Sequence, residues 1–366
     1  MIDFTTKKAV LLLEDGTFLT GQAFGKTGTA TGEICFNTGM TGYQEVFTDP
    51  SYFGQILIMN SVHTGNYGVN KTDSESDGVK VKGVIGRNLE EKYSRFMADD
   101  SLQDYFEKQN VVAINGVDTR ALVAHVRTKG AMNCILSSEI DDINELTALL
   151  KKVPSMGGLE LASHVSTKES YTLGDEKADI KVAVMDFGIK KNILNCFTER
   201  GVFVKVFNAK TSFEEMEKFS PAGYFISNGP GDPAPMDYAV DTIKQIMKAD
   251  KPVFGICLGQ QLLALANGIP TFKMHHGHRG LNHPVKNLLT GRSEITTQNH
   301  GFGVDANAVE NNPDIEITHI NLNDKSIEGI RIKNKKAFSV QYHPEATPGP
   351  HDSRYLFDDF IAMMKK

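Results

Sequence analysis

Residues 252–261 read PVFGICLGQQ, and this stretch decides the fold of the second half of the chain. An apolar run ends at Gly255, helix-forming residues begin at Leu258, and Cys257 stands at the corner between them. With Gly259 on its other side, Cys257 occupies the central position of a nucleophile elbow, with sulfur in place of the serine oxygen. Glycines permit a tight turn and keep side chains away from the reacting atom. The pattern predicts a strand, a sharp turn and a helix, with Cys257 as the nucleophile.

A base for this thiol is present near the end of the sequence, where residues 341–345 read QYHPE. A helix N-terminus stabilises a thiolate, and His343 can accept the thiol proton and return it to a leaving amine. Glu345 is placed to orient the imidazole. The competing interpretation is that Cys257 is a small buried hydrophobic residue and that His343 is a loop residue before Pro344. The elbow and the His-x-Glu run together favour catalysis.

Strands and helices alternate between residues 182 and 267, which predicts a parallel sheet with helices on both faces. Reactive groups in such sheets gather at the carboxyl ends of the strands, where Cys257 falls. Short strands with turns are expected after Gly268. The predicted strands are Val182–Phe187, Val202–Phe207, Gly223–Ser227, Val253–Ile256 and Ala337–Gln341, and the predicted helices are Lys190–Arg200, Phe213–Lys218, Tyr238–Ala249, Leu258–Asn267 and Arg354–Met364.

The first half of the chain is expected to start with strands. Residues 14–16 (EDG) predict a hairpin turn, and Asp118 is a good helix N-cap. The predicted strands are Ala9–Leu13, Thr17–Phe24, Gly32–Asn37, Gln55–Met59 and Lys82–Ile85, and the predicted helices are Leu102–Gln109, Thr119–Thr128 and Glu139–Lys152.

The apolar pattern lapses from about His164 to Asp179, which suggests a linker. We therefore predict an α/β protein with a β-rich α+β domain over residues 1–165, a linker over residues 166–180 and a mostly parallel-sheet domain over residues 181–366.

Composition excludes several classes of protein. The chain has 366 residues and a net charge of −6, which argues against a general nucleic-acid surface. No apolar run reaches the roughly 20 residues that a membrane span needs, and residues 1–4 (MIDF) lack the pattern of a signal peptide. The four cysteines include no C-x-x-C pair, which fits a reducing compartment. We expect a cytoplasmic protein.

Three further clusters are weaker by themselves. Residues 228–233 (NGPGDP) form a loop that can present backbone N–H groups to an anion, although an ordinary turn has the same composition. Residues 298–302 (QNHGF) offer groups that can bind an amide, and again a turn is the alternative. His275, His276, His278 and His283 lack an interleaved acidic or cysteine ligand, so we predict a hydrogen-bonded polar loop and no metal.

Three blocks make the second half resemble the triad-type (class I) glutamine amidotransferases: residues 227–233, 255–261 and 341–345. The first half is similar to the N-terminal domain of the carbamoyl-phosphate synthase small-subunit family. This similarity lies in residues 36–45 (FNTGMTGYQE), 49–52 (DPSY), 118–120 and 127–130, and residues 186–194 (DFGIKKNIL) resemble the start of that family's amidotransferase domain. The resemblance covers nearly the whole chain.

The resemblance implies that Cys257 attacks the side-chain amide of glutamine, that His343 transfers the proton and that Glu345 orients His343. It places the oxyanion hole at the backbone N–H groups of Gly231 and Leu258. It places the glutamine contacts at Ser51, Gly229, Gly231, Leu258, Gln261, Asn299, Gly301 and Phe302.

The resemblance also implies a partner, the carbamoyl-phosphate synthase large subunit. That subunit would receive ammonia and make carbamoyl phosphate from bicarbonate and ATP, for arginine or pyrimidine biosynthesis. ATP and Mg²⁺ are expected there, and no cofactor is expected in this chain, which has no phosphate-cradling motif of its own. Nucleic acid and membranes are not expected partners of this heterodimer.

Two alternatives remain open at this point. The chain could be a regulatory or scaffolding subunit without activity, because a fold does not imply a function. It could also be an amidotransferase that feeds a different acceptor. The complete set of Cys257, His343 and Glu345 argues against the first alternative, and the similarity of the first half argues against the second.

Overall fold

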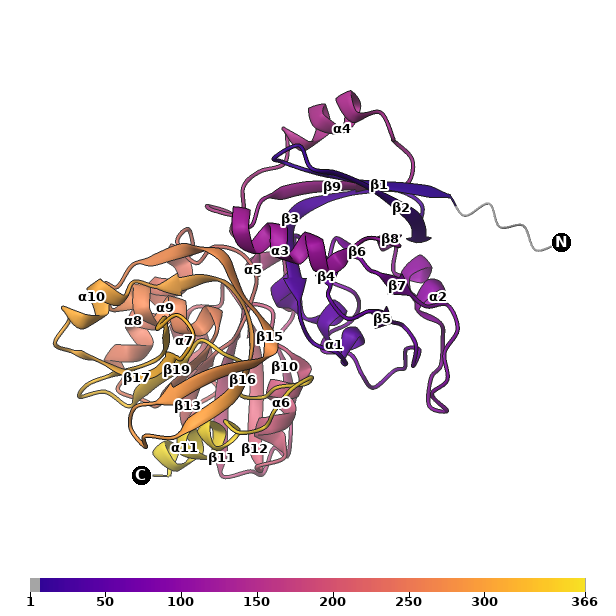
Figure 1. The fold of residues 1–366 in the computed structure, drawn as a ribbon. Coiled ribbons are helices and arrows are strands. Elements are labelled where there is room, and N and C mark those ends of the chain that lie inside the picture. The colour runs from indigo at the N-terminus through magenta and orange to yellow at the C-terminus, as the bar shows by residue number, and fades with distance from the viewer. Residues whose placement is uncertain (1–6, 366) are drawn as a thin grey trace. The chain divides into compact units, whose positions relative to one another are not determined.

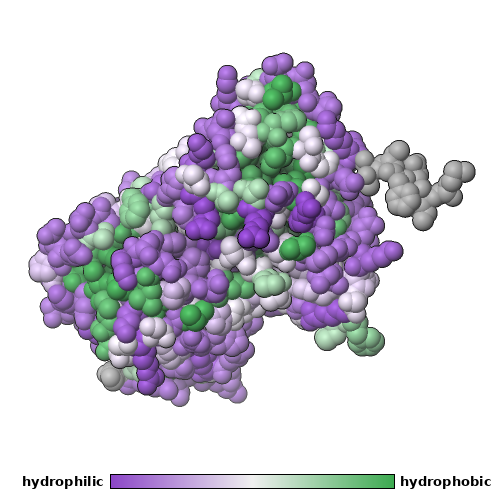
Figure 2. Space-filling model, viewed as in Figure 1, coloured by the Kyte–Doolittle hydropathy of each residue, from purple (hydrophilic) through white to green (hydrophobic). Residues whose placement is uncertain are grey.

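The computed structural model describes residues 7–365. The chain divides into two compact units, Met1–Met156 and Gly157–Lys366 (Figure 1). On the face shown in Figure 2, hydrophilic residues cover much of each unit, and hydrophobic residues gather in smaller patches. Among residues 7–365, no helix combines the length and the apolar composition needed to cross a membrane.

The first unit is built on a closed barrel with the strand order β1-β2-β8-β6-β4-β3-β9. Successive side chains of a strand point to opposite faces, so Leu11 and Leu13 join the large apolar cluster of the barrel, whereas Val10 and Leu12 pack with Leu146 of helix α4. The barrel strands are β1 Lys8–Leu13, β2 Phe18–Gly25, β3 Thr29–Asn37, β4 Gln55–Met59, β6 Gly83–Ile85, β8 Val112–Asn115 and β9 Asn133–Ser137, and a separate pair is β5 His63–Thr64 with β7 Asn88–Leu89.

The helices of this unit begin at polar caps. Asp118 accepts a hydrogen bond from the N–H of Ala121 and is the predicted N-cap of α3. Asp142 caps α4 in the same way, so this helix begins later than the predicted Glu139. The helices are α1 Tyr43–Thr48, α2 Leu102–Lys108, α3 Thr119–Lys129 and α4 Ile143–Leu150, with a 3₁₀ helix η1 at Pro50–Tyr52.

The second unit contains a ten-stranded sheet with the order β10-β12-β11-β13-β14-β19-β18-β17-β15-β16. The pairs from β12 through β11, β13 and β14 to β19 are parallel. The strands from β19 to β16 pair in antiparallel fashion. The strands are β10 Tyr171–Leu173, β11 Ile180–Asp186, β12 Val202–Asn208, β13 Gly223–Ile226, β14 Val253–Ile256, β15 Thr271–Asn287, β16 Ser293–Val304, β17 Ile315–Asn321, β18 Ile327–Ile332 and β19 Ala337–Val340.

Helices cover both faces of the parallel part of this sheet. Ala183 and Met185 of β11 pack in the apolar cluster that contains α8 and α9, and Val182 and Val184 pack in the opposite cluster with α6 and α11. This alternation confirms the predicted α/β class. The helices are α5 Ala162–Val165, α6 Lys191–Thr198, α7 Phe213–Glu217, α8 Asp237–Lys248, α9 Leu258–Ala266, α10 Ala306–Glu310 and α11 Tyr355–Met364.

The segment proposed as a linker differs in the structure. Strand β10 pairs with β12 of the second sheet, and the N–H of Thr167 donates to Asp186 at 2.7 Å. The division between the compact units lies at Met156 and Gly157, before the predicted linker. Strand β10 has only three residues, and all three are exposed at the edge of the sheet, so it is too short for its alternation of apolar and polar residues to stand out in the sequence.

Candidate active site

Cys257 follows β14 directly and is the N-cap residue of α9. Its backbone has φ 56° and ψ −104°, a conformation that costs a residue with a side chain on the order of 1–3 kcal/mol. The side chain is buried, and its Sγ donates to the carbonyl of Asn299 at 3.6 Å. The structure therefore places the thiol on the strained corner that the sequence predicts.

The two flanking glycines are required by close packing between helix and strand. A Cβ on Gly259 would run into the carbonyl oxygen of Ile226 in β13, and a Cβ on Gly255 would lie 2.8 Å from the backbone of Gly259. Real Cβ atoms do not make such approaches, so both positions need glycine. The sequence analysis attributed these glycines to a tight turn. In the structure neither glycine has a positive φ, and close packing is the reason that they are needed.

His343 is brought to Cys257 by the pairing of β14 with β19. Ile256 and Val340 are partners in this parallel pair, and the N–H of Cys257 donates to the carbonyl of Val340 at 2.8 Å. His343 follows Val340 by three residues, and its own N–H donates to Thr297 of β16 at 2.9 Å. A nucleophile and a histidine that are far apart in sequence thus leave two neighbouring strand ends.

Glu345 completes the arrangement. Its Oε1 lies 2.7 Å from Nδ1 of His343, and both side chains are almost completely buried. This contact fixes the orientation of the imidazole ring and leaves Nε2 as the ring nitrogen that is not bound to Glu345. In the described residues, Nε2 of His343 has no hydrogen-bond partner.

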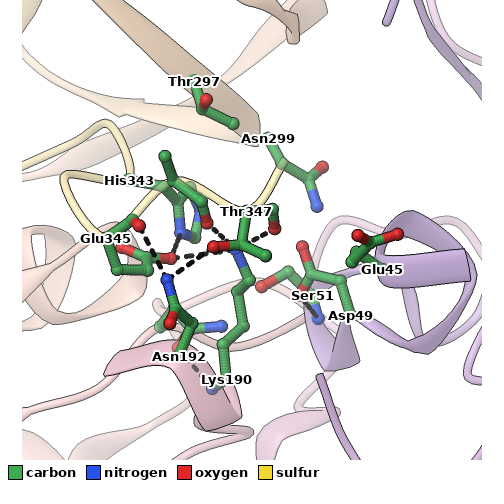
Figure 3. A network of polar contacts seen from close by, with 12 residues as sticks. Glu45, Asp49, Ser51, Lys190, Asn192, Thr297, Asn299, His343, Glu345 and Thr347 are labelled. Carbon is green, nitrogen blue, oxygen red and sulfur yellow. Dashed lines mark hydrogen bonds and ion pairs between the residues drawn. The ribbon is translucent and has the colours of Figure 1, made fainter. Parts of the chain in front are cut away.

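Two further polar residues hold Glu345, and the sequence analysis gave neither a role (Figure 3). Nζ of Lys190 lies 3.0 Å from Oε1 of Glu345 and also donates to the carbonyls of Ala346 and Thr347. Nδ2 of Asn192 donates to the carbonyl of Glu345 at 2.8 Å. Both residues lie at the start of α6, in the segment 186–194 that was noted only for its family resemblance.

The charges around His343 and Glu345 determine the protonation states of these two residues. Burial opposes the charged form of His343, but the Glu345 carboxylate and the neighbouring Cys257 raise the pKa of His343 to about 10. Burial also opposes the charged form of Glu345, but Lys190 and His343 lower its pKa to about 2. At neutral pH the imidazole is therefore protonated and the carboxylate is ionised.

The predicted glutamine contacts of the second unit lie on the segments that adjoin Cys257. Leu258 is the first residue of α9, and its leucine side chain packs near Gly229, where an added Cβ would lie 2.8 Å from Cδ2 of Leu258. Gly231 has φ 91° and an added Cβ there would meet the carbonyl of Leu159. Both glycines lie in the loop that follows β13, and β13 is the neighbour of β14 in the sheet.

The remaining predicted contacts lie on β16 or face it. Nε2 of Gln261 donates to the carbonyl of Phe302 at 3.0 Å, and Asn299 accepts from Arg279 through its Oδ1. An added Cβ on Gly301 would lie 3.3 Å from Arg279. Asn299, Gly301 and Phe302 all lie in β16, and the carbonyl of Asn299 is 3.6 Å from the thiol. Their contact with glutamine stays a prediction.

Ser51 belongs to the first unit. It lies in η1, is buried, and its N–H donates to the side chain of Asp49 at 2.9 Å. Its predicted contact with glutamine also stays a prediction.

Comparison with known proteins agrees with this geometry. Residues 183–363 match the family model for class-I glutamine amidotransferases, and residues 11–136 match the CPSase domain of the carbamoyl-phosphate synthase small chain. The second unit is therefore a class-I glutamine amidotransferase domain.

Relatives that match this chain along nearly their whole length show which family of class-I glutamine amidotransferases it belongs to. A protein of Chlorobaculum tepidum named carbamoyl phosphate synthase small chain is 46% identical over 98% of both chains. Proteins of the same name from Salmonella typhi and Thermotoga maritima are also 46% identical, over 98% and 99% of both chains respectively. This chain belongs to the carbamoyl-phosphate synthase small-chain family.

Proposed function

We propose that this chain hydrolyses glutamine through a thioester on Cys257 and delivers the ammonia to a carbamoyl-phosphate synthase large subunit. The observation that carries the proposal is that the pairing of β14 with β19 brings His343 beside the Cys257 side chain, while Nδ1 of His343 lies 2.7 Å from Glu345. Family membership supports the choice of glutamine as the substrate, because residues 183–363 match the class-I glutamine amidotransferases. The relatives named carbamoyl phosphate synthase small chain support the choice of the large subunit as the partner.

In the first step, Sγ of Cys257 attacks the side-chain carbonyl carbon of glutamine. The proton of the thiol passes from Sγ to His343, so that the attacking group is the thiolate, and the imidazolium donates the proton to the departing nitrogen, which leaves as ammonia when the C–N bond breaks. Backbone N–H groups of Gly231 and Leu258 would bind the oxyanion. Water then attacks the thioester, with His343 as the base, and releases glutamate and the free thiol.

Glu345 and Lys190 act by holding His343. The carboxylate stabilises the imidazolium and fixes which nitrogen faces the thiol. Lys190 keeps the buried carboxylate of Glu345 ionised, as the low pKa of Glu345 indicates. Their role is positioning, because neither touches the reacting sulfur.

The large subunit would supply ATP, Mg²⁺ and the bicarbonate site. The sequence of this chain has no phosphate-cradling motif, which supports that division of labour. We expect no cofactor in the glutaminase reaction itself, because a thiolate, an imidazolium and backbone donors suffice for amide hydrolysis. A cytoplasmic location remains part of the proposal.

The test is glutamate release from glutamine by the purified full-length chain, with and without a cognate large subunit. Cys257→Ser should abolish release, since serine has a much higher pKa than cysteine in a site arranged for a thiolate. Cys134→Ser is the matched control, because Cys134 is also a buried free cysteine but lies on β9, in the barrel of the first unit. Wild-type activity that the partner increases supports the coupled reaction.

Two outcomes would contradict the proposal. Wild-type turnover in Cys257→Ser would show that another group is the nucleophile. A folded wild-type chain that forms the complex but releases no glutamate would favour the scaffolding alternative.

A further inference from the structure

A second group of buried side chains lies beyond the proposed active site. His278 of β15, His300 of β16 and Glu328 of β18 each offer one ligand atom, and these atoms all lie within 4.8 Å of one another. The three residues are 7%, 5% and 0% exposed. The proposed glutamine hydrolysis uses none of these side chains, so their convergence requires a separate explanation.

The strand pairing produces this convergence. His278 and His300 are direct partners in the antiparallel pair of β15 and β16, and their rings are nearly perpendicular with centroids 4.9 Å apart. Nδ1 of His278 lies 3.3 Å from Oε1 of Glu328. This contact is an ion pair when His278 is protonated, whereas Oε2 of Glu328 has no hydrogen-bond partner in the described residues. Buried polar atoms without partners are costly, and each one calls for an explanation.

The surroundings resemble the outer shell of a metal site. Metal-binding histidines usually donate their other ring N–H to a carboxylate or a backbone carbonyl. Nε2 of His278 lies 2.8 Å from Asp324, and Nδ1 of His300 lies 2.8 Å from the carbonyl of Phe302. Nδ2 of Asn321 donates to Oε1 of Glu328 at 3.0 Å. Each of the three inner residues thus has an oriented outer partner.

Gln298 adds a further oxygen at the same place. Because a carbonyl only accepts, the bond to Phe302 puts the hydrogen of neutral His300 on Nδ1 and leaves a lone pair on Nε2. Nε2 faces Oε1 of Gln298 at 2.7 Å. Two acceptors that face each other repel, and a cation that binds both removes the conflict if the two atoms move farther apart than 2.7 Å. A rotation of the Gln298 amide group by 180° also removes this repulsion, because the side-chain NH₂ group then faces Nε2 of His300. This arrangement is the metal-free alternative.

We propose that His278, His300 and Glu328 bind a Zn²⁺ ion. Two imidazole nitrogens and one carboxylate are an established donor set for zinc, which takes a fourth ligand from water or from a further side chain. The sequence analysis predicted no metal because it considered four histidines of a single segment. The structure presents a different set, in which the acidic ligand comes from β18 and the second histidine from β16.

The proposed ion goes beyond the glutaminase function and would stabilise the strands that carry it. His300 lies between Asn299 and Gly301, the predicted substrate contacts on β16. The carbonyl of Glu328 accepts from the N–H of Gln341, two residues before His343. Zinc would thus connect β15, β16 and β18 at one point and make the site more resistant to local unfolding.

The test uses the full-length chain, stripped with a chelator and then titrated with Zn²⁺, with metal content and thermal stability as readouts. Co²⁺ in place of Zn²⁺ should give the visible absorption of a tetrahedral site. Glu328→Gln removes a ligand and should weaken binding by more than the 10–100-fold expected for an outer partner, which Asp324→Asn removes. His275→Gln is the control, because His275 is exposed on the same strand and outside the group.

Saturable one-to-one binding that Asp324→Asn weakens and His275→Gln does not would support the site. Asp324 lies at the edge of the group, with 45% of its side chain exposed, so this variant should fold even if Glu328→Gln does not. Absence of saturable binding by the wild-type chain, or equal binding by a folded Glu328→Gln variant, would overturn the proposal in favour of the metal-free hydrogen-bonded group.

Discussion

Cys257 is held in a backbone conformation that a residue with a side chain adopts only at a cost. We predict that Cys257→Gly is more stable to urea than Cys257→Ala by about 1–3 kcal/mol, because both variants lose the sulfur but only glycine relieves the strain. Both variants should lack glutaminase activity. At an ordinary helix position the order is reversed, with glycine less stable than alanine by about 1 kcal/mol.

Ala264 in the interior of α9 provides that comparison. Ala264→Gly should lower the free energy of unfolding, opposite in sign to the difference at position 257. An alanine variant at 257 that equals or exceeds the glycine variant in stability would show that the corner is not strained.

Lys190 is the countercharge for a fully buried carboxylate. Lys190→Met should lower the free energy of unfolding at neutral pH by about 3–5 kcal/mol, because a buried carboxylate then keeps only one of its two positive partners, His343. Lys335→Met is the control, since its ion pair with Asp250 is largely exposed and should contribute about 0–1 kcal/mol. Adding Glu345→Gln should restore much of the lost stability, and a double variant as unstable as Lys190→Met would contradict this account.

At the scale of residues, Cys257, His343 and Glu345 could be singled out in the sequence because each lies in a short run beside a strand end. The structure brings His343 and Glu345 within 2.7 Å of each other, and their catalytic roles stay predictions. The sequence analysis did not predict the role of Lys190, whose partner Glu345 is 155 residues away. A lysine after a strand has no distinguishing local pattern, so only the folded chain reveals this contact.

Helix α9 packs on the sheet so closely that its second residue has no room for a side chain. Gly259→Ala should destabilise the domain by several kcal/mol or displace α9, because the added Cβ meets the rigid carbonyl of Ile226. Glutaminase activity should fall if α9 is displaced, since the N–H of Leu258 moves with the helix. Thermal unfolding and glutamate release together measure both effects.

Gly303→Ala is the matched control on β16. Its added Cβ would lie 3.4 Å from ring atoms of Phe272, an ordinary contact with an exposed side chain. Equal effects of the two substitutions would show that helix–strand packing is not the reason for glycine at 259.

Elements with a clear apolar period were predictable within a few residues. Strands β4 and β14 match their predicted bounds, and α3 begins at the predicted cap. Helix α1 was missed because it lies in a glycine-rich run that reads as turns. Strand β15 was expected as short strands because two irregularities interrupt its pairing with β16 and break the alternation of side chains.

At the scale of the whole molecule, the buried pair of Glu345 and His343 should make stability depend on pH. The pKa of Glu345 falls from 4.5 to about 2 on folding, so its contribution is present above pH 4.5 and is lost as pH falls through 2. The pKa of His343 rises from 6.5 to about 10, so its contribution is present below pH 6.5 and is lost as pH rises through 10.

Glu345→Gln should flatten both regions of the curve, because it removes the acid and the charge that stabilises the imidazolium. Urea unfolding at a series of pH values measures this. Glu316→Gln, which removes a more exposed partner of Arg331, should leave both regions unchanged. Identical curves for Glu345→Gln and the wild-type chain would contradict the assigned charges.

The parallel pairing of β14 with β19 also sets an order of events during synthesis of the protein. The nucleophile leaves the ribosome 86 residues before its histidine, since Cys257 precedes His343 by 343 − 257 positions. Until Ala337–Val340 has emerged, β14 has no neighbour on that side, and the thiol has neither its imidazole nor the carbonyl of Val340 that receives its backbone N–H. A nascent or prematurely terminated chain that lacks this strand therefore has no histidine beside Cys257, and we expect it to release no glutamate from glutamine.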